Sequence, residues 1–303
     1  MTINHFQSNQ PLVIETAMSR VVANTGGDEK TTEYIVAEAK NCLDSGAGIV
    51  HVHHDFSLGL DDAIAQVIEI NRSILAEYPG ALLYPAYMAG HKVEEQMRHL
   101  RPFHESGQMT MFAFDPGTTE HGRADKDGLL TGSIISGTTF EQATKMVELS
   151  HEFGVPTALG IFHPAFLTWV RSLGAAGKFV PGTYAKFYFA GGAAWGAEQS
   201  RSTFGVPPTK EALDIYVDML DGANLPWFAS VMGGEILKTD LLRQTIEKGG
   251  HIRTGQEDPL RDVDMTNAEM IQKVIEVANE VGRPVAKWSE AQEVLSRQMT
   301  VSA

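Results

Sequence analysis

Three histidines and an aspartate crowd the end of one apolar run. The segment reads GIVHVHHDF over residues 48–56, and its apolar part is predicted to be a strand. Residues i and i+2 of a strand point to the same face, about 6.5–7 Å apart, so His51 and His53 could bind one metal ion together. His54 and Asp55 follow, where either could orient a ligand ring. His-x-His alone fits a polar strand end with hydrogen-bonded imidazoles equally well.

A second group of reactive side chains lies on the last predicted strand and just after it. The segment GGHIRTGQED, residues 249–258, contains an imidazole, a guanidinium and two adjacent carboxylates. Glu257 could be the third ligand, because two imidazoles and one carboxylate leave an open position on a catalytic zinc. Arg253 could hold a substrate carboxylate with two parallel hydrogen bonds, and Asp258 could be a general base. The alternative is a solvated cluster of ion pairs on a loop that enters a helix.

The elements that must position these groups alternate between short strands and amphipathic helices. Eight strands are predicted, at Pro11–Met18, Ile49–His53, Ala81–Tyr87, Met109–Phe114, Thr157–Phe162, Tyr184–Phe189, Trp227–Met232 and His251–Thr254. Helices are predicted between the strands and after the last one, at Thr31–Ser45, Leu60–Glu77, Phe140–Phe153, Phe166–Ser172, Lys210–Leu220, Thr239–Glu247 and Asn267–Val281. Such long connections imply parallel strands. Residues 117–139 are expected to form a long loop.

Eight such units indicate a closed (β/α)8 or TIM barrel. A doubly wound open sheet is the alternative, but no GxGxxG follows the first strand. We expect residues 1–303 to form one barrel domain with a C-terminal helical extension. Catalytic groups lie at the C-terminal ends of the strands in such barrels, and both reactive segments fall at that end.

Weaker candidates lie near other strand ends. Glu15 could reach the barrel mouth or pair with a core arginine. Gly233 and Gly234 leave backbone amides accessible, and the loops after the seventh and eighth strands often bind phosphate in these barrels. A tight turn is the simpler interpretation of this glycine pair. Asp115 lies in FDPGTT, whose Asp-Pro-Gly is ordinary turn chemistry.

Composition limits the classes of partner and location. The chain has 303 residues, one cysteine and a net charge of −14. A single cysteine excludes an internal disulfide and a cysteine-based zinc site, and a reducing, cytoplasmic location fits. The acidic balance argues against a nucleic acid or an anionic membrane as partner. We see no apolar signal segment at the start and no run near the roughly 20 residues that cross a bilayer.

GAGIVHVHHD and GGHIRTGQED, together with the closing EVGRPVAKWSEAQEVL, resemble the β-keto acid cleavage enzymes, such as the 3-keto-5-aminohexanoate cleavage enzyme. The resemblance implies a zinc-bound TIM barrel, commonly a homotetramer. It also implies condensation of a β-keto acid with acetyl-CoA, which gives acetoacetate and a new CoA thioester. By motif, His51, His53 and Glu257 match the zinc ligands. Arg253 and Asp258 match the family's arginine and general base.

The chain departs from this family at several positions. Residues 20–24, RVVAN, lack the acid that binds a substrate ammonium, and Arg20 favours a neutral or anionic substrate. Leu159 falls where the family has a buried glutamate. Tyr87 and Thr110 are the nearest counterparts of two substrate-binding hydroxyl residues. The alternative functions are another metal-dependent barrel hydrolase or C–C lyase that does not use CoA, or a barrel whose histidines are only structural.

Overall fold

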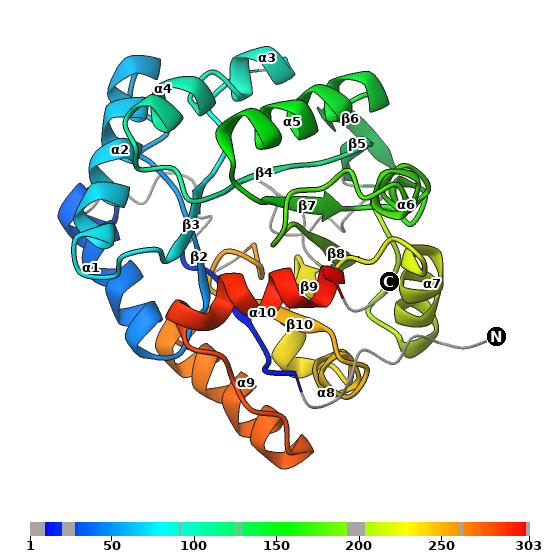
Figure 1. The fold of residues 1–303 in the computed structure, drawn as a ribbon. Coiled ribbons are helices and arrows are strands. Elements are labelled where there is room, and N and C mark those ends of the chain that lie inside the picture. The colour runs from blue at the N-terminus through cyan, green and yellow to red at the C-terminus, as the bar shows by residue number, and fades with distance from the viewer. Residues whose placement is uncertain are drawn as a thin grey trace.

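A computed structural model describes residues 10–19, 28–90, 92–124, 127, 129–192, 204–260 and 263–300. Eight parallel strands form one sheet that curves around a central axis, with helices on the outside (Figure 1). The strand order is β3-β2-β1-β10-β9-β8-β7-β4. The bounds are β1 Ile14–Ala17, β2 Ile49–Val52, β3 Leu82–Pro85, β4 Phe112–Phe114, β7 Thr157–Ile161, β8 Tyr184–Ala190, β9 Trp227–Met232 and β10 His251–Thr254. The predicted (β/α)8 barrel is confirmed.

The helices lie between successive strands or cover the barrel ends. They are α1 Thr32–Asp44, α2 Leu60–Leu75, α3 Val93–Gln96, α4 Leu100–Glu105, α5 Phe140–Phe153, α6 Phe166–Ala175, α7 Lys210–Leu220, α8 Leu241–Glu247, α9 Asn267–Val281 and α10 Trp288–Thr300, with short 3-10 turns η1 Asp28–Lys30 and η2 Ile236–Lys238. Their ends follow local capping chemistry: Thr139 and Thr266 form capping boxes. Gly154 and Gly282 end α5 and α9 in left-handed conformation.

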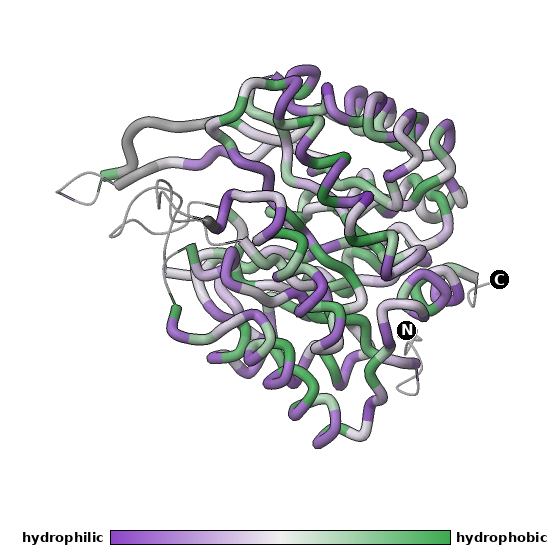
Figure 2. The backbone as a smooth tube through the Cα atoms, turned by 90° about the vertical axis from the view of Figure 1, so that its left-hand side faces the viewer, coloured by the Kyte–Doolittle hydropathy of each residue, from purple (hydrophilic) through white to green (hydrophobic). Residues whose placement is uncertain are grey.

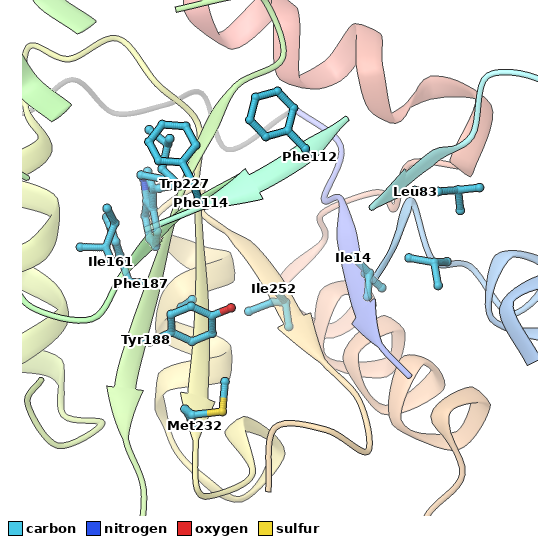
Figure 3. Close-up of a cluster of buried hydrophobic side chains, with 14 of the residues drawn as sticks. Ile14, Leu83, Phe112, Phe114, Ile161, Phe187, Tyr188, Trp227, Met232 and Ile252 are labelled. Carbon is cyan, nitrogen blue, oxygen red and sulfur yellow. The ribbon is translucent and has the colours of Figure 1, made fainter. Parts of the chain in front are cut away.

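Alternation along each strand divides the interior into two layers. Strand residues such as Ile14, Phe114 and Trp227, labelled in Figure 3, belong to one hydrophobic cluster with buried side chains of the helices. Leu159 belongs to the same cluster, so the positions of β7 that face the barrel axis are Ala158 and Gly160. In Figure 2 the central part of the tube is largely hydrophobic, whereas the outer helices alternate between hydrophobic and hydrophilic residues.

Helix α10 closes the end of the barrel where the strands begin. It crosses in front of the strands in Figure 1, and Ala291 and Leu295 pack there with inward residues of the strands. His251 bonds at this end as well: its Nδ1 accepts from the Val13 amide at 2.9 Å, and its Nε2 lies 3.0 Å from Gln298 Oε1. His251 is therefore a core residue, and the expectation that its imidazole belongs to the site is wrong.

The segment after β4 is a β-hairpin and not the predicted long loop. Strands β5 Thr118–Ala124 and β6 Leu130–Gly137 pair antiparallel in a separate sheet. Gly137 has φ +91°, and a Cβ there would lie 1.9 Å from the Gly117 carbonyl oxygen, so the hairpin base requires glycine. The hairpin places His121 and Ser136 on the wall of the central cavity.

Strands β3 and β4 lie next to each other, but their described residues form no ladder of backbone hydrogen bonds. The Thr110 hydroxyl bridges them, because it accepts from the Leu83 amide at 2.9 Å and donates to the Leu83 carbonyl at 3.2 Å. The Thr110 side chain thus provides hydrogen bonds between these two neighbouring strands. No helix in the described part of the chain is both long and apolar enough to cross a membrane.

Candidate metal centre and active site

The three predicted metal ligands converge at the C-terminal end of the barrel. Glu257 Oε2 lies 3.3 Å from His51 Nε2 and 3.5 Å from His53 Nε2. The candidate ligand atoms of the three residues lie within 4.8 Å of one another. This is the arrangement of two imidazoles and one carboxylate that the sequence predicted.

Strand β1 explains why these residues meet. It lies between β2 and β10, and its last residue, Ala17, pairs with His51. The Glu257 amide donates to the Ala17 carbonyl at 3.2 Å, so the chain after β10 folds back over the end of β1. Gly255 makes that turn at φ +137°, where a Cβ would lie 2.2 Å from the Ala17 oxygen. Glycine is required here because both the backbone angle and the close contact exclude a side chain.

His51 and Glu257 are in the chemical state that a cation requires. Burial lowers the pKa of His51 to about 3, so the ring is neutral. Its Nδ1 lies 3.1 Å from the Tyr84 carbonyl oxygen, which can only accept; Nδ1 therefore carries the hydrogen and Nε2 a free lone pair. Burial would raise the pKa of Glu257, but the nearby Arg253 charge holds it well below its usual range. Tyr84, and not His54 or Asp55, thus orients the first ligand.

Glu257 Oε2 provides a test of whether a metal fits. It is buried and has no well-aligned hydrogen bond within the described ranges, although Arg253 Nη2 and both imidazoles lie within 3.5 Å of it. A buried carboxylate oxygen without a hydrogen bond is costly, and a cation between the two imidazoles and this oxygen would satisfy it. The donor set therefore fits a divalent metal ion. Nitrogen and carboxylate ligands suit zinc and also ferrous iron.

Arg253 lies beside the triad, surrounded by three carboxylates. Its Nε donates to Asp258 Oδ1 at 2.8 Å, its Nη1 donates to Glu15 Oε1 at 3.0 Å, and its Nη2 lies 3.1 Å from Glu257 Oε2. The side chain lines the cavity but is 1% exposed. Arg253 thus bonds mainly to carboxylates of the protein itself. This limits the two parallel hydrogen bonds to a substrate carboxylate that the sequence suggested.

Asp258 is held by two donors. Ser230 donates to its Oδ2 at 2.5 Å, while Arg253 bonds its other oxygen. Burial raises the pKa of Asp258, although Arg253 and Ser230 oppose the shift. A buried, oriented carboxylate with a raised pKa has the properties of a general base. Ser230 gave no sequence signal, because it is one small residue inside the apolar strand WFASVM.

A buried network forms the floor of the site. Glu15 Oε1 lies 2.9 Å from Lys186 Nζ, and the hydroxyls of Tyr84 and Tyr184 donate to the two carboxylate oxygens at 2.5 and 2.6 Å. Burial opposes ionisation of Glu15, but Lys186 and Arg253 lower its pKa to about 2. The suggestion that Glu15 pairs with a core arginine is confirmed. Lys186 was missed, although a lysine inside YAKFYF is a detectable signal.

A cavity of about 330 Å³ opens above this floor. It is lined by the triad and Arg253, Tyr84, Pro85, Ala86, Tyr87, Ala113, Asp115, His121, Ser136, Ala158, Gly160, Phe162, Lys186, Tyr188 and Met232. Tyr87 is thus placed where the sequence suggested a substrate contact. Asp115, interpreted above as turn chemistry, also faces the cavity; its neighbours His121 and Ser136 were assigned to a loop.

The other predicted substrate residues lie elsewhere. Thr110 does not line the cavity and bridges β3 and β4 instead. The Gly233 amide donates to the Asp258 carbonyl at 2.7 Å, so it is not available to a phosphate. A Cβ on Gly191 would lie 2.4 Å from the Gly234 amide nitrogen, which shows how closely the two glycine-containing turns pack. Arg20 lies outside the described residues.

Fold and site together define a class: a (β/α)8-barrel enzyme with a metal-binding triad and a carboxylate–arginine pair in one cavity. A family model for the beta-keto acid cleavage enzymes matches residues 29–296. The chain belongs to the β-keto acid cleavage enzyme family, and the predicted class of acyl-transferring enzyme is confirmed.

Individual relatives agree with this assignment. The 3-keto-5-aminohexanoate cleavage enzyme of Acetoanaerobium sticklandii is 25% identical over 270 residues, which cover 88% of this chain and 89% of that protein. The 3-oxoadipate:acetyl-CoA acetyltransferase of Cupriavidus necator is 33% identical over 96 residues, 30% of this chain and 33% of that one. The solved structure of ObcA shares the fold, with a TM-score of 0.63 at 14% identity, covering 88% of this chain and 64% of ObcA.

Proposed function

We propose that the protein cleaves a β-keto acid in a zinc-dependent reaction with acetyl-CoA. In the overall reaction the bond between the keto carbon and the carboxymethyl group of the β-keto acid breaks. The carboxymethyl unit joins the acetyl carbon to give acetoacetate, and the remaining acyl group forms the new CoA thioester. The observation that supports this most is the meeting of His51, His53 and Glu257 with the Arg253–Asp258 pair in a chain of this family.

Each side chain has a defined task in this proposal. His51, His53 and Glu257 would hold the metal, which when bound supplies a Lewis acid for the keto oxygen and the developing negative charge. Asp258 removes a proton from the substrate, which prepares the carbon nucleophile for attack on the thioester. Ser230 and Arg253 fix the Asp258 carboxylate in place. The buried Glu15–Lys186 pair holds Arg253 from the other side.

The experiment is an activity screen with the purified, zinc-loaded protein. Acetyl-CoA is mixed with β-keto acids of different chain charge, and acetoacetate and the new CoA thioester are measured by mass spectrometry. We expect both products in equal amounts. Product formed without acetyl-CoA would favour the CoA-independent lyase or hydrolase, and no acetoacetate from any acid would refute the proposal.

Metal dependence has its own test. We expect His51→Ala and Glu257→Gln to lose the metal measured by mass spectrometry of the purified protein and to lower kcat by about a thousandfold or more. His151→Ala, an exposed histidine on α5, is the matched control and should retain both. Retained metal in both ligand variants would contradict the assignment of the site. The homotetramer and the cytoplasmic location remain predictions, and light scattering of the purified protein tests the first.

A further inference from the structure

Asp115 is a buried acid of the cavity that the mechanism above does not use. It follows β4, which is opposite β10 in the ring of eight strands, so it lies across the cavity from Arg253 and Glu257. The Asp115 side chain occupies space that is free because residue 160 is a glycine. A Cβ on Gly160 would lie 2.1 Å from Asp115 Oδ1 and 3.4 Å from the Tyr188 ring. Glycine at this position of β7 therefore admits the carboxylate to the cavity wall.

The charge of Asp115 is not neutralised by a direct ion pair within the described residues. Its side-chain hydrogen bond comes from the Tyr87 hydroxyl, while Lys186 and Arg253 act on it only through their charge, since both are paired with Glu15. Burial raises the pKa of Asp115 to about 6, which still leaves it mainly ionised at pH 7.5. His121, on the same wall, adds no positive charge, because burial lowers its pKa to about 4.

The wall around Asp115 is aromatic. Tyr87, Phe162 and Tyr188 line the same cavity, and the rings of Phe162 and Tyr188 stack with their centroids 4.6 Å apart. Aromatic faces attract cations through their negative quadrupole, and a desolvated site strengthens the effect. A carboxylate next to several aromatic rings is therefore suited to a positively charged ligand group and unsuited to an anionic one.

The charge balance of the cavity points the same way. Among the described residues, four carboxylates line it or bond to its lining, namely Glu15, Asp115, Glu257 and Asp258. Lys186, Arg253 and a divalent metal on the triad would carry four positive charges and cancel them. The carboxylate of a β-keto acid then adds one negative charge to a buried site. A cation at the other end of the same molecule would restore neutrality, and a neutral chain would not.

From these observations we infer that Asp115 determines specificity by binding a positively charged group, such as an ammonium, at the far end of the β-keto acid chain. The inference rests on the proposed function and names its substrate class: a zwitterionic β-keto acid. It differs from the neutral or anionic substrate expected from the sequence. That expectation considered only the segment after the first strand, whereas the acid here comes from the fourth strand of the barrel.

The test compares three substrates with acetyl-CoA in the zinc-loaded protein. They are 5-amino-3-oxohexanoate, its neutral isostere 5-methyl-3-oxohexanoate, and the anionic 3-oxoadipate. For the wild type we expect kcat/KM to be about tenfold or more higher for 5-amino-3-oxohexanoate than for its isostere, and lowest for 3-oxoadipate. Asp115→Asn should lower the ratio of kcat/KM for 5-amino-3-oxohexanoate to that for the isostere by about 10- to 100-fold. Asp55→Asn, a carboxylate on the loop after β2 that does not line the cavity, should leave the ratio unchanged.

Two results would overturn the inference while the proposed function stands. One is a wild-type preference for the neutral or anionic acid. The other is an Asp115→Asn variant that slows all three acids equally, which would indicate proton transfer in place of cation binding. If Asp115→Asn does not fold, Gly160→Ala replaces it, because its methyl group would displace the carboxylate and should lower the same ratio.

If no acid yields acetoacetate, the proposed function fails, and binding is then measured without acetyl-CoA by calorimetry. The inference alone still predicts that wild-type protein binds 5-amino-3-oxohexanoate about tenfold or more tightly than Asp115→Asn does. Equal affinities of the two proteins would refute it.

Discussion

Glu15 and Arg253 are register partners on the neighbouring strands β1 and β10, and their side chains form a 3.0 Å ion pair with at most 1% of either residue exposed. Lys186 bonds the same carboxylate from β8. One anion thus lies between two buried cations beneath the metal triad. The main role of such an anion is to neutralise the buried charges and not to add net attraction, because its loss would leave buried charges unpaired.

Glu15→Gln should therefore destabilise the fold by about 3–5 kcal/mol, because it leaves Lys186 and Arg253 facing a neutral amide in the interior. Urea denaturation of the purified protein measures this free energy. The double variant Glu15→Gln with Lys186→Met removes one of the two cations and should recover part of the loss. A loss below about 1 kcal/mol for Glu15→Gln would show that the network does not have this role.

The stability of the protein should fall as pH decreases below about 6.5, in part because of His251. Burial holds the pKa of this ring at about 3 against 6.5 for an ordinary histidine, and the nearby Arg283 charge acts in the same direction. Between those values the unfolded chain binds a proton that the folded chain does not. The folded state thus loses about 1.4 kcal/mol per pH unit from this residue, with no contribution above pH 6.5.

Urea unfolding at pH 7.5 and pH 5.5 tests this dependence. His51, His54 and His99 have lowered pKa values for the same reason and add to the wild-type change. His251→Gln should reduce the difference between the two pH values by about 1 kcal/mol. His151→Gln, the exposed control on α5, should not. Identical pH dependence in wild type and His251→Gln would refute the assignment.

Ser230→Ala should lower kcat by about tenfold, because Asp258 loses the donor that fixes its Oδ2. KM and metal content should stay close to wild type, since Ser230 is not among the residues that line the cavity or form the triad. Ser230→Thr keeps a hydroxyl and should recover much of the rate. Steady-state kinetics measure both variants, and equal kcat for Ser230→Ala and wild type would exclude a positioning role.

Thr110→Val should destabilise the barrel by about 1–3 kcal/mol, because the Leu83 amide and carbonyl lose their partner between β3 and β4. Thr110→Ser retains the hydroxyl and should stay near wild-type stability in urea. We expect kcat/KM of both variants within about twofold of wild type, since Thr110 does not line the cavity. A large fall in kcat/KM at unchanged stability would instead support the substrate contact that the sequence suggested.

Much of the fold followed from local patterns. Apolar alternation and helical periodicity predicted all eight barrel strands, and β9 and β10 agree with the prediction to the residue. Two expectations failed because they left out how strands pair and which way their side chains point. The segment 117–139 has many glycines and polar residues and was assigned to a loop, yet it pairs with itself as a hairpin. The family resemblance likewise placed Leu159 at the position of a buried glutamate of the site, whereas the pleat of the strand turns Leu159 towards the helices.

The sequence by itself predicted the candidate metal ligands, because His51 and His53 are two residues apart on a strand and Glu257 follows a strand that ends at the same edge of the barrel. Strand period and the shared direction of parallel strands predicted that these three side chains could meet, and the family motifs assigned them as ligands. Tertiary structure alone decided the partners that lie on other strands: Tyr84 behind His51, Ser230 behind Asp258 and Asp115 above Gly160. Their roles depend on which strands are neighbours in the closed barrel and on which side chains face inward. Neither property can be predicted from a single position of the sequence.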